Sequence, residues 1–139
     1  MNISACIANR HGEHTVLLRT EAREHSLTIA PKAEGLGSGT NGGELLFLAL
    51  ATCYCNDIYR EARKRGIDVE RVQVEVTGEF GGEGDGARNI RYSASVDARA
   101  PREEVLALMR HTDSVAEIHN TLRQSSPVVL AECEAREIP

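Results

Sequence analysis

The chain has 139 residues, of which 41% are hydrophobic and 27% charged, as in an ordinary globular domain. This length predicts a single domain, residues 1–139, with one hydrophobic core. The net charge of -5 argues against nucleic-acid binding, which depends on clustered Lys and Arg side chains. No apolar run reaches the ~20 residues that span a bilayer, and the opening residues lack a signal-peptide core, so we expect a cytoplasmic protein with no membrane partner.

The first third of the chain predicts strands followed by a loop. Asn2–Ala8 and His14–Arg19 flank a short turn and predict a β-hairpin, and the alternating segment His25–Ala30 predicts a third strand. Five glycines mark residues 32–43 as a loop. Part of that loop fits the GxGxxG pattern of dinucleotide sites, but it does not directly follow a strand and no acidic residue follows at the required spacing. We therefore reject a nucleotide site.

A long helix, Glu44–Gly66, is predicted at the centre of the chain. Asn41 can cap its first turn, with Glu44 in the reciprocal capping-box position, and Gly66 can end it. Its first half, Leu45–Cys55, is almost entirely apolar. A helix that is apolar all round must be buried all round, so we expect this half to form the core of the fold.

Two more strands follow the central helix. Glu70–Phe80 and Arg88–Ala98 alternate apolar and polar residues on either side of a glycine-rich turn, which predicts an antiparallel pair with one exposed face.

The last third predicts two helices and a closing strand. Pro101 opens a helix that breaks at residues 111–113, and a shorter helix, Ser114–Arg123, follows. Val128–Cys133 predicts the closing strand. The resulting fold class is α+β, with antiparallel sheets packed against helices.

Cysteine is the most informative residue type for chemistry. Cys53 and Cys55 are two residues apart on the central helix, so their side chains differ by about 200° and cannot form a disulfide or a metal-binding pair. Either can be a small buried hydrophobic residue, which is the usual state of a free cysteine. The histidines have no ligand spacing, and we expect His119 to be solvent-exposed. The sequence therefore predicts no metal and no cofactor.

A resemblance gives Cys53 a second interpretation. Residues 41–53, NGGELLFLALATC, resemble the OsmC/Ohr family pattern NPEELLLAALAAC, and the likeness extends over the whole chain. It implies an OsmC-like fold with antiparallel sheets around a long central helix, in an intertwined homodimer. It also implies that Cys53 is the peroxidatic thiol. Two positions depart from the pattern, because Gly42 replaces the proline and Gly43 replaces the first acidic residue.

The second family motif, CP[IV][SH]xxL, resembles residues 116–122, AEIHNTL. Here Ala116 replaces the resolving cysteine and Glu117 replaces the proline. In the family the peroxidatic thiolate is oxidised to a sulfenic acid, which the resolving cysteine captures as a disulfide. Cys53 therefore has no partner at the usual place, and the sequence does not bring Cys6 or Cys133 to it. A one-cysteine cycle that uses an external thiol reductant remains open.

Reactivity also depends on the charge beside Cys53. A thiolate needs a nearby cation, and burial in an apolar helix raises the pKa of a thiol instead. The resemblance implies an arginine from the opening strands, paired with a glutamate ahead of the helix. Arg10 or Arg19 is the candidate arginine, and Glu44 is the candidate glutamate unless it only caps the helix.

Two functions from different classes remain. The first is a thiol-dependent peroxidase of the oxidative stress response that reduces organic hydroperoxides through Cys53. The alternative is a non-peroxidatic relative that binds a small apolar ligand at the dimer interface, beside Cys53 and Tyr54. Asn56 and Asp57 lie one helical turn beyond Cys53 and are further candidates for this pocket.

Overall fold

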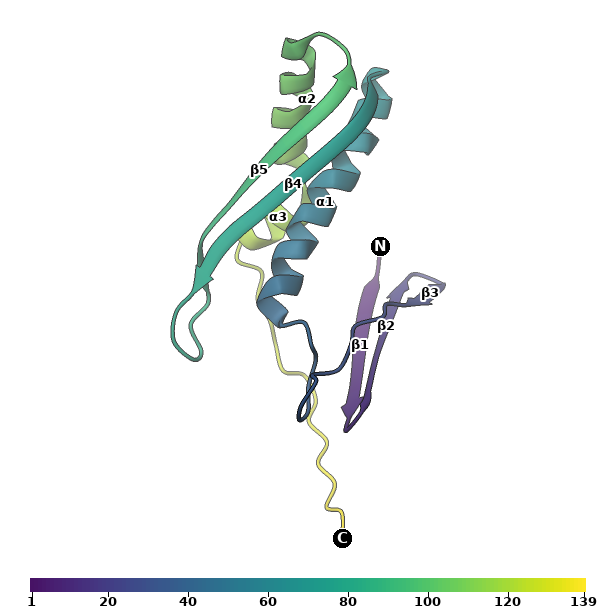
Figure 1. Cartoon of the computed structure of the whole chain (residues 1–139), viewed down its shortest axis with the longest axis vertical. Coiled ribbons are helices and arrows are strands. Elements are labelled where there is room, and N and C mark those ends of the chain that lie inside the picture. The colour runs from purple at the N-terminus through teal and green to yellow at the C-terminus, as the bar shows by residue number, and fades with distance from the viewer. The chain divides into compact units, whose positions relative to one another are not determined.

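The computed structural model describes residues 1–139 and has the predicted α+β class, with two sheets and three helices (Figure 1). The elements follow in the order β1 (Ile3–Arg10), β2 (Glu13–Thr20), β3 (Arg23–Ser26), α1 (Gly42–Arg65), β4 (Asp68–Phe80), β5 (Ala87–Arg99), α2 (Arg102–Val115) and α3 (Glu117–Arg123). Contacts divide the chain into two units, residues 1–48 with 80–87 and residues 49–79 with 88–139. Each unit is described by itself.

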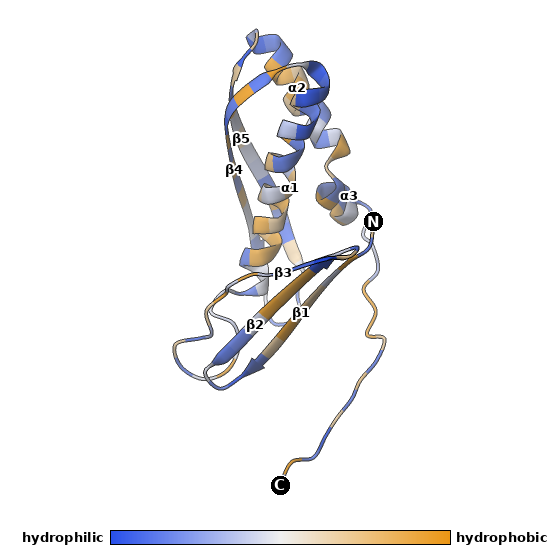
Figure 2. Ribbon diagram, turned by 90° about the vertical axis from the view of Figure 1, so that its right-hand side faces the viewer, coloured by the Kyte–Doolittle hydropathy of each residue, from blue (hydrophilic) through white to orange (hydrophobic).

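The first unit contains an antiparallel sheet in the order β1-β2-β3. Hydrophobic residues are prominent along β1 and β2 (Figure 2), and β1 is exposed along its whole length. The predicted hairpin is confirmed, with Ile3 opposite Thr20 at its open end. The third strand begins and ends earlier than predicted. A tight turn at Glu21, where φ is 51°, brings Arg23 into register with Thr20, and pairing ends at Ser26.

The glycine-rich loop is held by local contacts. Gly37 has a φ of 108°, and its backbone N–H donates to Asn9 Oδ1 at 2.9 Å. Gly39 passes so close to Ala30 that an added Cβ would lie 2.8 Å from the Ala30 carbonyl oxygen. Two of the three glycines of the GxGxxG match, Gly37 and Gly39, are thus required by backbone conformation and close packing.

Helix α1 begins and ends as the sequence predicts. The Asn41 side chain accepts a hydrogen bond from the Glu44 N–H, and Glu44 accepts one from the Asn41 N–H, both at 2.8 Å. Gly66 follows the last turn with a φ of 66°. The expected all-round burial of Leu45–Cys55 is wrong for the single chain, because Leu50 is 3% exposed but Leu48 is 57% exposed.

The second unit packs α1, α2 and α3 on one face of the β4-β5 ribbon (Figure 1). Its core consists of Tyr54, Ile58 and Ala62 of α1 with Leu108 of α2, all at most 3% exposed. The apolar faces of the strands complete this core with partly buried residues that include Val72, Val74, Tyr92, Ala94 and Val96. The alternation of the strands therefore positions α1 over the sheet.

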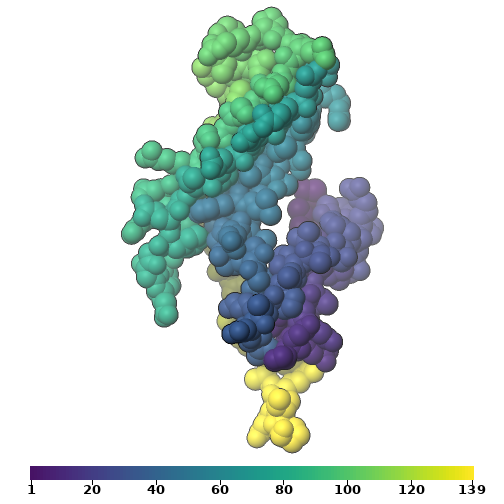
Figure 3. All heavy atoms as spheres, in the orientation of Figure 1, coloured from purple at the N-terminus to yellow at the C-terminus, as the bar shows by residue number.

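Two predictions near the end of the chain are wrong. Helix α2 continues through residues 111–113, where Thr112 Oγ1 donates to the Leu108 carbonyl at 2.8 Å, and the break falls at Ala116, whose backbone is extended. The predicted strand Val128–Cys133 does not form. Residues 126–139 pair with no strand, and Val128 is 98% exposed. Figure 3 shows the end of this segment as the yellow C-terminal atoms. None of the three helices has the length and hydropathy of a membrane-spanning segment.

Candidate functional site

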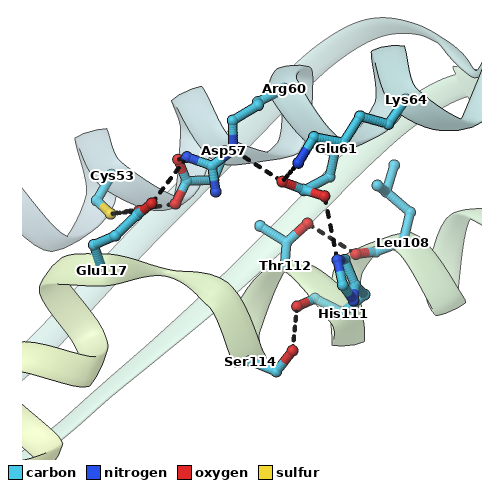
Figure 4. Close-up of polar contacts among 10 residues, drawn as sticks. All are labelled: Cys53, Asp57, Arg60, Glu61, Lys64, Leu108, His111, Thr112, Ser114 and Glu117. Atoms are coloured by element: carbon cyan, nitrogen blue, oxygen red, sulfur yellow. Dashed lines mark hydrogen bonds and ion pairs between the residues drawn. The ribbon is translucent and has the colours of Figure 1, made fainter.

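Cys53 lies in the second unit, half-buried where α1 faces the start of α3 (Figure 4). Its Sγ donates to Asp57 Oδ2, one turn further along α1, at 3.4 Å. It also lies 3.9 Å from Glu117 Oε2, on the first residue of α3. The thiol is therefore placed between two carboxylates.

The one guanidinium in this cluster pairs with carboxylates. Arg60 Nη1 lies 2.7 Å from Asp57 Oδ1 and 3.2 Å from Glu117 Oε1, and its Nε lies 2.9 Å from Glu61 Oε1. Residues 53, 57, 60, 61 and 64 are three or four apart, so they share one face of α1. The positive charge of Arg60 is thus balanced by acidic groups, and the groups that contact Cys53 are carboxylates.

This arrangement raises the pKa of the Cys53 thiol above its ordinary value of 9.0. Burial is the largest cause, and the carboxylates of Asp57 and Glu117 add to it, whereas the backbone N–H of Ile118 acts in the opposite direction. Burial also raises the pKa of Asp57. Because the thiolate is the reactive form of cysteine, the geometry holds Cys53 as a neutral hydrogen-bond donor at neutral pH.

Glu61 is the most strongly paired acid of the cluster. Its buried carboxylate meets Arg60 and Lys64, each at 2.9 Å, and His111 Nε2 at 3.2 Å. Hydrogen bonds from Arg60 and then Lys64 lower the pKa of Glu61 from 4.5 to about 2. This carboxylate connects the cluster on α1 to α2.

Replacing Glu61 with glutamine is expected to weaken the acid dependence of stability. Because its folded-state pKa is lowered, Glu61 contributes stability that is present above about pH 4.5 and is lost as the pH falls through about 2. Free energies of unfolding in urea at about pH 6 and about pH 3 measure this dependence. Glu103→Gln, at an exposed acid of α2, is the control and should keep the wild-type dependence. A Glu61→Gln variant with that same dependence would contradict the assignment.

The sulfur of Cys53 and carboxylate oxygens of Asp57 and Glu117 all lie within 4.8 Å of one another. They are the residues of this cluster whose donor atoms could hold a cation. Arg60 already pairs with both carboxylates, so a metal ion would have to displace its guanidinium.

Comparison with known proteins places the chain in a family. Residues 35–131, more than half of the chain, match the family model described as OsmC-like protein. The chain belongs to the OsmC-like protein family. Comparison with curated proteins found no significant match.

Solved structures share the OsmC-like fold. An OsmC-like protein from Mycoplasma pneumoniae matches with a TM-score of 0.61 and 19% identity, covering 88% of this chain and 89% of that one. An organic hydroperoxide resistance protein from Elizabethkingia anophelis matches with a TM-score of 0.57 and 17% identity, covering 88% and 89%. An OsmC-like hydroperoxide resistance protein from Jannaschia matches with a TM-score of 0.55 and 14% identity, covering 91% and 86%.

The other candidate residues from the sequence are divided between the two units. Arg10 and Glu44 belong to the first unit, where Arg10 pairs with Glu13 at 2.9 Å and Glu44 caps α1. Arg19 pairs there with Glu24.

In the second unit, Tyr54 is a core residue whose hydroxyl donates to the Met109 carbonyl at 2.9 Å. Asn56 is exposed, and Asp57 alone of these candidates contacts Cys53.

The positions that depart from the OsmC pattern have clear structural consequences. Ala116, in place of the resolving cysteine, is fully buried. Glu117, in place of the proline, supplies the second carboxylate beside Cys53. Gly43, in place of the first acidic residue, lies against Phe80, where an added Cβ would come within 2.8 Å of the ring. An acidic side chain at this position would require Phe80 to move.

Sequence reasoning missed three residues of the second unit. Glu117 could be recognised as the proline replacement, and Arg60 as a cation one turn from Asp57. Only the fold brings Glu117 to Cys53 and to Arg60. The expectation that His119 is exposed is wrong, because its side chain is 4% exposed and its ring centroid lies 4.8 Å from that of Tyr92. Since α3 begins at Glu117 and not at Ser114, its inward face carries His119, and Ile118 is 37% exposed.

Proposed function

We propose that this OsmC-like protein is a non-peroxidatic member of its family that binds a small apolar molecule, with Cys53 acting as a neutral thiol. The observation that carries its non-peroxidatic character is the pair of carboxylates around the sulfur, Asp57 at 3.4 Å and Glu117 at 3.9 Å. A peroxidatic cysteine requires the opposite environment, in which a cation stabilises the thiolate.

The chemistry of the peroxidatic cycle supports the same conclusion. A thiolate attacks the terminal oxygen of a hydroperoxide, the O–O bond breaks, and the products are a sulfenic acid and an alcohol. A second thiol must then reduce the sulfenic acid. Ala116 stands where the resolving cysteine would be, and the other cysteines, like Cys53, are free thiols in the structure, Cys6 and Cys133 being exposed.

Turnover of cumene hydroperoxide with dithiothreitol as reductant tests this proposal. We expect the wild type and Cys53→Ser to consume the hydroperoxide at the same rate, because a protonated thiol reacts slowly. Cys55→Ser is the matched control, since it removes a thiol from the same helix but from another face. A rate that falls at least about tenfold in Cys53→Ser alone would contradict the proposal.

The second candidate is a one-cysteine hydroperoxide reductase. It is favoured by the partial exposure of Cys53 at the position of the family's peroxidatic cysteine, and by relatives from Elizabethkingia anophelis and Jannaschia that are hydroperoxide resistance proteins. In this scheme an external thiol condenses with the sulfenic acid to a mixed disulfide and water, and a second external thiol reduces that disulfide to restore Cys53. Trapping of a sulfenic acid on Cys53 by dimedone, after one equivalent of cumene hydroperoxide, would favour this candidate over the first.

A further inference from the structure

A small cavity lies in the second unit between α1, the β4-β5 ribbon and α3. Its volume is about 170 Å³, and its apolar walls come from Leu50, Val76, Ile90 and Leu122. An apolar cavity of ~150 Å³ in a protein interior is large enough to bind benzene. This cavity therefore fits a molecule with a single six-membered ring and one small substituent.

One polar side chain in the cavity wall has no partner. His119 is 4% exposed, and neither of its ring nitrogens has a hydrogen-bond partner in the protein. A buried polar group without a hydrogen bond destabilises the fold, and a ligand that supplies the bond removes this cost. Burial and then the charge of Arg123 lower the pKa of His119, so its imidazole is neutral and offers one donor and one acceptor.

The groups around His119 are already paired with other residues. Tyr54 donates its hydroxyl to Met109, and Tyr92 donates its hydroxyl to Asp113. Arg123 Nη2 lies 2.7 Å from Asp113 Oδ1, so the positive charge beside the cavity is neutralised. A charged ligand would find no free counter-charge here, whereas a neutral hydroxyl would find the imidazole.

From these observations we infer that the cavity binds a small neutral aromatic alcohol. Its ring packs between the apolar walls, and its hydroxyl hydrogen-bonds to His119. The inference rests on the proposed function, because it names a site and a chemical class for the small apolar molecule. The site is separate from Cys53, which is not among the residues that line the cavity.

Binding of phenol and toluene to the full chain tests the inference, because the two molecules differ only by a hydroxyl in place of a methyl group. We expect phenol to bind the wild type about tenfold more tightly than toluene, which corresponds to one buried hydrogen bond. Titrations followed by NMR supply the affinities. In the same titration the imidazole nitrogens of His119 should shift with phenol and not with toluene.

Two variants locate the site. His119→Phe should remove the preference for phenol, whereas His25→Phe, at an exposed histidine of the first unit, should keep it. Leu50→Trp fills the cavity and should abolish binding of both molecules. The wild-type titration decides the matter even where a variant does not fold.

Equal affinities for phenol and toluene, or His119 signals that phenol leaves unchanged, would overturn the inference. The inference would also be overturned if, at saturating phenol, His119 were hydrogen-bonded to water and not to the phenol hydroxyl. These outcomes leave the proposed function standing, because that proposal fails only if hydroperoxide turnover depends on Cys53. The two failures are therefore distinguishable in parallel samples of one preparation.

Discussion

Replacing Leu108 with alanine is expected to lower the free energy of unfolding by about 2–5 kcal/mol. Leu108 is fully buried and joins α2 to the α1 residues Tyr54, Ile58 and Ala62 in the core of the second unit. Removing its side chain loses the transfer free energy of the buried methyl groups and leaves a cavity that rigid neighbours fill only in part. Urea unfolding followed by circular dichroism measures the change.

Leu36→Ala is the matched control for this variant. Leu36 is 62% exposed in the loop of the first unit, and its replacement should change the free energy of unfolding by no more than about 0.5 kcal/mol. If Leu108→Ala and Leu36→Ala have equal effects, the core does not lie between α1 and α2 as described.

The second large effect concerns the reactivity of Cys53. The double variant Asp57→Asn, Glu117→Gln removes both negative charges beside the sulfur but keeps side chains of nearly the same shape. Because these charges raise the pKa of the thiol, their removal should lower it and increase the thiolate fraction at neutral pH. The rate of alkylation of Cys53 by iodoacetamide at about pH 7, followed by mass spectrometry, should rise several-fold.

Glu75→Gln tests whether any lost carboxylate has this effect. Glu75 is exposed on β4 and is not among the groups that raise the pKa of Cys53. Cys53 of the Glu75→Gln variant should therefore be alkylated at the wild-type rate. A double variant that reacts no faster than Glu75→Gln would show that burial alone controls the thiol.

The elements with strong local signals were predicted correctly from the sequence. Helix α1 has a capping box at Asn41 and Glu44 and a glycine stop at Gly66, and both are local features that need no tertiary information. The alternation in β4 and β5 likewise identified both strands and their apolar face. The predicted homodimer stays a prediction.

The candidate site was predictable only in part. Cys53 and Asp57 are one helical turn apart, so their contact follows from sequence spacing. Glu117 reaches the same sulfur from 64 residues away, and nothing local fixes that approach. The inward position of His119 depends on where α3 begins, and element boundaries are the least certain part of a sequence-based prediction.

The strand Val128–Cys133 was predicted from β propensity, which requires a neighbouring strand to have any effect. The structure provides none, and the segment stays exposed.

The pKa of Cys53 itself measures whether its thiol is neutral, and the proposed function depends on that. Thiolate absorbance is followed against pH in a variant in which Cys6, Cys55 and Cys133 are replaced by serine, so that only Cys53 titrates. We expect a midpoint above 9.0, the ordinary value for a thiol. A midpoint below about 7, which would make Cys53 a thiolate at neutral pH, would contradict it.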